Sequence, residues 1–280
     1  MRLFMSLFTP INALYVVATP IGHPLDITLR ALQVLKGVDV VAAEDTRVTA
    51  ALLKYHGISA SLVSIREHNE KAGAQWLIEA LSQGKSVAYV SDAGTPAISD
   101  PGAVLVAAAH QAKRQVVPVP GASALTAALS VCGWQGEPHF MGFLAPKGRE
   151  RLDLLRRIKH NVAISIIYEA PHRILGTLDD LAEACGVQRP MCLAKELTKT
   201  HETLVLGTVV EIQAYFAADS KRQQGEFVLL IAPAPASDVN LAGAETMMQV
   251  LLTELPRAKA AKLTAKLTGI SKEVAYELAL

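Results

Sequence analysis

The sequence lacks the marks of secreted, metal-binding and strongly basic proteins. Its three cysteines are odd in number and have no metal-ligand spacing, so we expect reduced thiols in a cytoplasmic protein and no metal site. Only 19% of the 280 residues are charged and the net charge is +1, which excludes a uniformly basic protein but permits a local basic patch. The N-terminal stretch Leu3–Gly22 is uncharged, but Pro10 and Pro20 interrupt it and Tyr15–Val17 fits a buried strand. No other segment is long and apolar enough to span a membrane.

Three familiar catalytic motifs are also missing. There is no Walker A sequence, which leaves triphosphate hydrolysis with little support. Ser123 lies in G-A-S-A rather than in a G-x-S-x-G elbow, so nucleophilic catalysis has weak support. The turn Ala18–His23, "ATPIGH", follows an apolar run as in nucleotide-binding domains, yet it is not the pyrophosphate-binding G-x-G-x-x-G.

Short apolar runs alternate with helical stretches through the first half of the chain. This alternation predicts an α/β fold with a parallel sheet covered on both faces, over residues 11–136. Closely spaced late strands predict a second α/β domain with a mixed sheet over residues 137–235. The Pro/Ala-rich stretch Ala232–Asp238 predicts a linker, and residues 240–280 a small helical unit. The expected strands are Leu14–Ala18, Val38–Ala42, Ser86–Val90 and Gln115–Val119, then Phe140–Phe143, Ala163–Tyr168, Met191–Ala194, Glu202–Leu206 and Phe227–Ile231.

Four polar loops follow the first four predicted strands. Ligands of parallel sheets bind at the carboxyl ends of the strands, so these loops are the expected site. The third, "SDAGTPAISDPG" (Ser91–Gly102), is the richest in Asp, Gly and Pro, residues that permit close backbone approach and stiffen a loop. One such loop is more often an ordinary turn, but four at one edge favour a binding site.

The ordered set of motifs resembles the tetrapyrrole-methylase superfamily, and within it the small-subunit rRNA cytidine-2′-O-methyltransferase I family. The motifs are "ATPIGHPLDIT", "AEDTR", "REHNE", "VSDAGTPAISDPG", "VPGASA", "YEAPHR", "KELTKTHE" and "GEFVLLI". The resemblance runs from Leu14 to the C-terminus, and it departs at His23, where the family pattern has Asn. It implies two α/β domains with S-adenosylmethionine in a cleft between them, and methylation of a decoding-centre cytidine in 16S rRNA within the small ribosomal subunit. It further implies a homodimer.

The resemblance also implies the cofactor-binding residues. S-adenosylmethionine has no pyrophosphate, so its first loop needs no G-x-G-x-x-G cradle. The matching positions are Ile21, Asp92, Ala93, Gly94, Thr95, Ile98, Ser123 and Ala124, with Tyr168 and Leu197 from the second half of the chain covering the adenosine. Glu44, Asp45 and Arg47 of "AEDTR" are interpreted as cleft-lining or substrate-side residues.

Ribose methylation calls for a proton acceptor or a cation beside the attacking oxygen. The polar clusters "REHNE" and "KELTKTHE" supply the candidates: His68 or Glu196 as proton acceptor and Lys195 as electrostatic stabiliser. Each cluster could instead be a solvated helix start or an ion pair.

A basic helix face near the C-terminus is the candidate RNA-binding surface. Lys259, Lys262 and Lys266 share one face, while Ala260, Leu263 and Leu267 form a separate apolar stripe; a soluble amphipathic helix is the alternative. Arg149 and Arg151 belong to a second basic cluster. Two rival functions remain open, a precorrin-type C-methyltransferase and a non-catalytic RNA-binding assembly protein.

Overall fold

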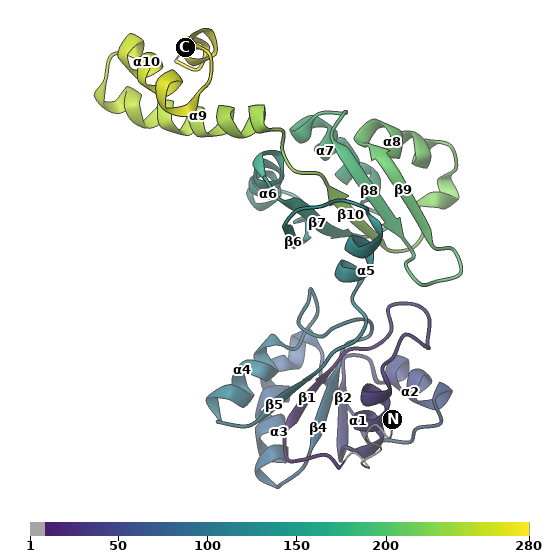
Figure 1. Cartoon of the computed structure of the whole chain (residues 1–280). Coiled ribbons are helices and arrows are strands. Elements are labelled where there is room, and N and C mark those ends of the chain that lie inside the picture. The colour runs from purple at the N-terminus through teal and green to yellow at the C-terminus, as the bar shows by residue number, and fades with distance from the viewer. Residues whose placement is uncertain (1–8, 280) are drawn as a thin grey trace, which may run out of the picture. The chain divides into compact units, whose positions relative to one another are not determined.

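The computed structural model describes residues 9–279, with only the backbone described for Glu67 and residues 236–242. Residues 3–8 of the uncharged N-terminal stretch therefore lie outside the described part. The chain forms two compact units, each with its own sheet (Figure 1). The first unit runs to Val131 and also includes Lys195–Thr203, while the second contains Cys132–Ala194 and the chain from Leu204 onward. No helix in the described residues is long and apolar enough to cross a membrane.

The first sheet is parallel throughout, as predicted. Its strand order is β3-β2-β4-β1-β5. The strands are β1 (Leu14–Val17), β2 (Val40–Ala43), β3 (Leu62–Ser64), β4 (Val87–Val90) and β5 (Val116–Val119). Because every strand points the same way, all the loops that follow the strands emerge at one edge.

Helices cover both faces of this sheet, which explains why its central strands are apolar without alternation. They are α1 (Leu29–Gly37), α2 (Thr46–Tyr55), α3 (Glu70–Ser82) and α4 (Ala103–Gln111), and a further short helix, α5 (Ala124–Val131), follows β5. One core cluster joins α1 and α2 to the sheet through Val34 and Leu53. The other joins α3 and α4 to the opposite face through Leu77 and Leu105.

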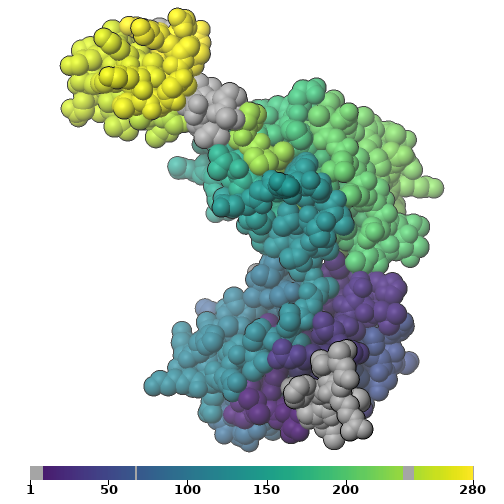
Figure 2. All heavy atoms as spheres, in the orientation of Figure 1, coloured from purple at the N-terminus to yellow at the C-terminus, as the bar shows by residue number. Residues whose placement is uncertain are grey.

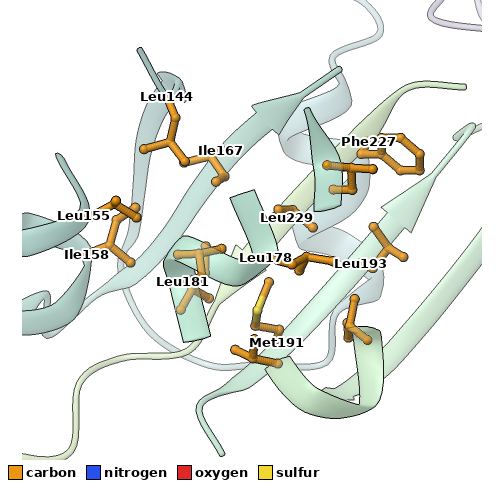
Figure 3. Close-up of a cluster of buried hydrophobic side chains, with 14 of the residues drawn as sticks. Leu144, Leu155, Ile158, Ile167, Leu178, Leu181, Met191, Leu193, Phe227 and Leu229 are labelled. Atoms are coloured by element: carbon orange, nitrogen blue, oxygen red, sulfur yellow. The ribbon is translucent and has the colours of Figure 1, made fainter. Parts of the chain in front are cut away.

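The second sheet is mixed, again as predicted. It has the order β6-β7-β10-β8-β9, with β6 parallel and β10 antiparallel to β7. The strands are β6 (Pro138–Phe143), β7 (Ile164–Glu169), β8 (Pro190–Lys195), β9 (Thr203–Thr208) and β10 (Phe227–Ile231), and the helices are α6 (Arg149–His160), α7 (Ile174–Cys185) and α8 (Val209–Ala217). Leu178, Met191 and Leu193 pack at the centre of its core (Figure 3).

A network of charged and polar side chains lies inside the second unit. The Glu169 carboxylate, whose side chain has no exposed surface, accepts a hydrogen bond from Thr177 Oγ1 at 2.6 Å and pairs with Arg173 Nε at 3.2 Å. Arg151 donates to Thr177 Oγ1 at 3.0 Å and pairs with Asp180 at 2.5 Å. These bonds tie β7 and α6 to α7 and satisfy groups that burial would otherwise penalise.

The predicted linker Ala232–Asp238 is irregular chain only over its first half, which the second unit holds in place. Arg189, a buried residue, donates to the carbonyls of Pro233 at 2.7 Å and Lys159 at 2.6 Å. The Ala234 amide donates to Asn161 O at 2.7 Å. The chain leaving β10 is therefore fixed to the end of α6 up to Ala234, and α9 begins two residues later at Ala236.

The last residues form a helical unit, as predicted, and its helices are α9 (Ala236–Glu254), α10 (Arg257–Thr268) and α11 (Lys272–Glu277). In Figure 2 these helices appear in yellow-green to yellow, packed on one another. Gly269, with φ +76°, ends α10, and the Ser271 hydroxyl caps α11. The expected apolar stripe is wrong at Leu267, which is 64% exposed; Ala260, Ala261 and Thr264 form the buried face.

Candidate active site

The loops after β1, β4 and β5 meet at the carboxyl edge of the first sheet, where these three strands are neighbours. Thr19 and Gly94 exchange two backbone hydrogen bonds, of 2.8 and 3.1 Å. The Thr95 hydroxyl donates to Ala122 O at 3.1 Å. The residues predicted from the resemblance to bind the cofactor in these loops are thus held on one continuous surface.

Small residues let the loops of this surface approach one another closely. Gly94 has φ +77°, and a Cβ built there would lie 3.4 Å from Ile21 Cγ2. A Cβ at Gly121 would lie 3.0 Å from the Cβ of Ala18. The predicted pair Ser123 and Ala124 lies at the start of α5, where Ser123 O accepts from the Ala127 amide at 3.0 Å.

Strained backbone flanks two of the predicted cofactor residues. In the described chain, five non-glycine residues have positive φ, and four of them stand directly before and after Ile98 and Leu197. They are Ala97, Ser99, Glu196 and Thr198, with φ between +51° and +68°. Each costs about 1–2 kcal/mol relative to right-handed backbone, and such strain gathers at binding sites. The side chains of Ile98 and Leu197 are therefore each held between two residues with strained backbone.

The loop after β8 belongs to the first unit by its contacts. The Thr198 hydroxyl accepts a hydrogen bond from the His23 amide at 3.0 Å. A Cβ at Gly22 would lie 2.6 Å from both Thr198 Oγ1 and Lys199 Cγ, and 2.8 Å from Leu197 O. Only glycine permits this approach. The sequence did not predict this contact between the turn after β1 and the loop after β8. Its one indication was the glycine of "ATPIG", Gly22, which permits close approach of another backbone.

Two predicted catalytic residues begin this loop. Lys195, at the end of β8, is 8% exposed and has no hydrogen-bond or ion-pair partner among the described residues. The neighbouring Glu196 accepts a hydrogen bond from Lys199 Nζ at 2.8 Å. A lysine whose side chain is mostly buried and has no counterion among the described residues is unusual in a structural role and common at catalytic sites.

The third candidate, His68, lies elsewhere. It is exposed in the 3₁₀ helix Glu67–Asn69, which follows β3 at the border of the sheet. The ends of β3 and β1 are three strand spacings apart, about 14 Å. Its neighbour Glu70 accepts from the Gly102 amide at 2.7 Å and so caps α4. Lys195 and Glu196 thus stand next to each other at the start of the loop that contacts the turn after β1, whereas His68 lies at the border of the first sheet.

The "AEDTR" motif ends β2 and begins α2. The Asp45 side chain accepts from the Arg47 amide at 2.8 Å and pairs with its guanidinium, and these bonds hold the pKa of Asp45 well below its ordinary value. Asp92 accepts from the Asp45 amide at 2.9 Å, which joins the predicted cofactor loop to β2. Among the described residues, no cluster of three His, Cys, Asp or Glu side chains could hold a metal ion.

The remaining predicted residues lie in the second unit. Tyr168 of β7 packs edge-to-face against Phe140 and Phe143, with ring centroids 4.8 and 5.7 Å away. Arg149 has a 93% exposed side chain, whereas that of Arg151 is 12% exposed and bound within the buried network. Lys259, Lys262 and Lys266 are all exposed on α10.

Comparison with known proteins decides the family. The model of Tetrapyrrole (Corrin/Porphyrin) Methylases matches residues 13–213, and that of the RsmI C-terminal HTH domain matches residues 238–280. The "Ribosomal RNA small subunit methyltransferase I" of Neisseria meningitidis serogroup B is 50% identical over 96% of this chain and 93% of its own length. The chain belongs to the ribosomal RNA small subunit methyltransferase I family. Its counterpart in Escherichia coli O157:H7 is 43% identical, over 95% of this chain and 94% of its own.

Membership in this branch of the tetrapyrrole methylases makes the chain an S-adenosylmethionine-dependent methyltransferase. The fold agrees: the crystal structure of the methyltransferase CobJ aligns with a TM-score of 0.61 over 79% of this chain and 94% of that one, at 18% identity. The carboxyl-edge surface suits this cofactor, because its glycines leave room for close approach and the Asp92 carboxylate suits a cationic group. No phosphate-binding loop is present, and this cofactor requires none.

Proposed function

We propose that the chain methylates the ribose 2′-hydroxyl of a decoding-centre cytidine in 16S rRNA, the family's cytidine 1402, within the small ribosomal subunit. The observation that carries this proposal is the match to small-subunit methyltransferase I over both the catalytic region and the C-terminal helices. Methylation assayed on purified small subunits, followed by mass spectrometry of the rRNA, tests it. Absence of a new 2′-O-methyl group on the cytidine would refute it.

Lys195 is the proposed electrostatic stabiliser. Bound S-adenosylmethionine supplies the electrophilic methyl group, and the attacking ribose oxygen gains negative charge as its proton leaves. The Lys195 ammonium, on a mostly buried side chain and without a counterion among the described residues, is suited to stabilise that charge. Glu196 and His68 remain the proposed proton acceptors, and Glu196 has the stronger support because it adjoins Lys195.

The test replaces each residue in turn, and for Lys195 and Glu196 it nearly preserves the side-chain volume. We expect Lys195→Met to lower turnover about 10²–10³-fold and to leave cofactor affinity within about threefold, since the lost interaction is made mainly in the transition state. Glu196→Gln should have a smaller effect and His68→Ala the smallest. Calorimetry with S-adenosylmethionine and single-turnover kinetics measure the two quantities. Full turnover in Lys195→Met would remove Lys195 from the mechanism.

We propose that α10 contacts RNA phosphates through Lys259, Lys262 and Lys266. These side chains are exposed on the helix face opposite the buried Ala260, Ala261 and Thr264, and α10 carries no acidic residue. Exposed Arg149 is kept as a second contact. Arg151 is left out because its guanidinium already binds Asp180 and Thr177.

Salt dependence tests this surface. Replacing the three lysines by Ala should weaken subunit binding and reduce the slope of log K against log salt by about 2 to 3, since each phosphate contact contributes about 0.7–0.9. Cofactor affinity should not change. The matched control is Lys54→Ala on α2, another exposed lysine in a helix. An unchanged slope in the triple variant would make α10 a packing element only.

A homodimer in the cytoplasm completes the proposal. β9 is the terminal strand of the second sheet, and it exposes Leu204 and Leu206 by 38% and 56%. An apolar edge strand of this kind favours pairing with another chain. Sedimentation should show a dimer for the natural chain and a monomer for Leu206→Lys. A monomeric natural chain would refute the assembly without affecting the proposed reaction.

A further inference from the structure

The orientation of His23 is fixed from two sides. Its backbone amide donates to the Thr198 hydroxyl at 3.0 Å. Thr198 is itself held, because its own amide donates to Glu202 Oε2 at 2.6 Å and its φ is +63°. Gly22 lets this loop lie directly against the turn that carries His23. The position of His23 is therefore set by the loop after β8, 175 residues away in sequence.

The ring of His23 has a defined protonation pattern. The Leu25 amide lies 3.3 Å from His23 Nδ1 and can only donate to it, so Nδ1 must carry a lone pair. In a neutral imidazole the proton then resides on Nε2. The side chain is exposed, so this N–H is a hydrogen-bond donor directed away from the Leu25 bond. In this arrangement His23 is a donor and not a proton acceptor.

Lys199, whose side chain meets the turn at Gly22, is already engaged, because its Nζ binds Glu196 at 2.8 Å. His23 also lies two residues after Ile21, which the resemblance places at the cofactor. A ligand that His23 contacts would thus be next to the cofactor surface and would offer an oxygen acceptor.

We propose that His23 Nε2–H donates a hydrogen bond to a ribose or phosphodiester oxygen of the RNA substrate, and that Thr198 is the positioning residue that holds His23 in place. The proposal rests on the proposed function, because it takes RNA as the acceptor. It adds a substrate-binding residue that no predicted site residue includes. Its effect falls on substrate binding and leaves the methyl-transfer step unchanged.

The first experiment compares His23→Phe with His23→Asn. Phe keeps an aromatic ring but has neither acceptor nor donor, whereas the Asn side chain can accept from the Leu25 amide through its oxygen and donate through its nitrogen. We expect His23→Phe to raise the KM for small subunits about tenfold, with kcat and cofactor affinity within about twofold. His23→Asn should stay close to the natural chain. An unchanged KM in His23→Phe would overturn the proposal.

The second experiment tests the positioning residue. Thr198→Val removes the hydroxyl at nearly constant volume and should raise KM as His23→Phe does, while Thr198→Ser should restore it. Thr200→Val, at an exposed position of the same loop, is the matched control and should have no effect. The double variant His23→Phe/Thr198→Val should be no worse than either single change, because both act on one contact. Additive effects would overturn the positioning role.

The natural chain in the same assay separates this proposal from the proposed function. If it methylates small subunits and His23→Phe keeps the natural KM, only the role of His23 fails. If the natural chain does not methylate subunits, the proposed function fails. Melting temperatures of all variants identify any that do not fold. If His23→Phe or Thr198→Val does not fold, the expected near-natural KM of His23→Asn and of Thr198→Ser still tests the proposal.

Discussion

The first unit has its strained and polar residues at the open edge of its sheet, whereas the second unit buries charged side chains beneath its sheet. In the first unit, the left-handed residues beside Ile98 and the close contact at Gly22 stand in loops. In the second, Glu169 and Thr177 are sealed between β7 and α7. The all-parallel topology explains the first pattern, because it directs every strand's following loop to one edge.

The contrast teaches that similar polar residues have different functions in the two units. A polar group held by strained backbone at an edge can meet a ligand. A polar group whose partners are all protein atoms stabilises the fold. "YEAPHR" illustrates the second case: Glu169 and Arg173 pair with each other, and the Arg173 guanidinium also binds Leu144 O. Changes in the second unit should therefore reduce stability, and changes at the edge should reduce binding.

The largest expected effect is on stability, in the second unit. Glu169→Gln should lower the free energy of unfolding by about 3 kcal/mol, because it leaves Arg173 as a largely buried, unpaired charge. Asp153→Asn, which breaks only exposed pairs on α6, should cost less than about 0.5 kcal/mol. Chemical denaturation measures both. A Glu169→Gln protein that kept its stability but lost turnover would reverse the comparison and make Glu169 a site residue.

The next effect is on cofactor binding, in the first unit. Gly94→Val should weaken S-adenosylmethionine affinity about a hundredfold, about 2.7 kcal/mol, since it adds a branched side chain against Ile21 at the cofactor surface. Gly57→Val is the control: Gly57 also has positive φ, +66°, but open space around it. It should incur the same backbone strain without loss of affinity. Equal affinities for the two variants in calorimetry would show that the cofactor lies elsewhere.

The smallest effect is a pH dependence in the first unit. Hydrogen bonds from the Ser86 hydroxyl and amide hold the pKa of Asp39 below its ordinary value. A depressed carboxylate stabilises the fold above its unfolded pKa, about 3.9, and this stabilisation is lost as pH falls through the folded value. The stability difference between the natural chain and Asp39→Asn should thus be full at pH 7 and shrink below about pH 4. A difference that grew on acidification would contradict the assignment.

Much of the fold could be predicted because the signals are local. Apolar runs bounded by Gly, Pro and Asp predicted the strands of both sheets, and Gly269 and Ser271 predicted the end of α10 and the start of α11. β3 was missed because its three residues, half-buried at the sheet border, show no usable alternation. The linker was predicted too long, because its composition does not show that α9 would begin at Ala236 or that Arg189 would bind the Pro233 carbonyl.

The candidate site was predictable in its residue types and not in its long-range contacts. Glycine and acidic residues in the loops after the strands predicted a binding site at this edge, and the family resemblance supplied the cofactor. The docking of Thr198 on His23 joins residues far apart in sequence, and no periodicity encodes it. His68 illustrates the limit: it stands in a polar cluster after a strand, yet strand order places that strand, β3, at the border of the sheet, and strand order is a tertiary property.

The four left-handed residues beside Ile98 and Leu197 carry a consequence for directed evolution. Glycine at any of these positions would release about 1–2 kcal/mol of backbone strain, against about 0.5–1 kcal/mol of added chain entropy in the unfolded state. A library selected only for heat resistance should therefore enrich Ala97→Gly and Thr198→Gly. The survivors would tolerate heat and turn over slowly, because the loops that present the two apolar side chains would sample many conformations.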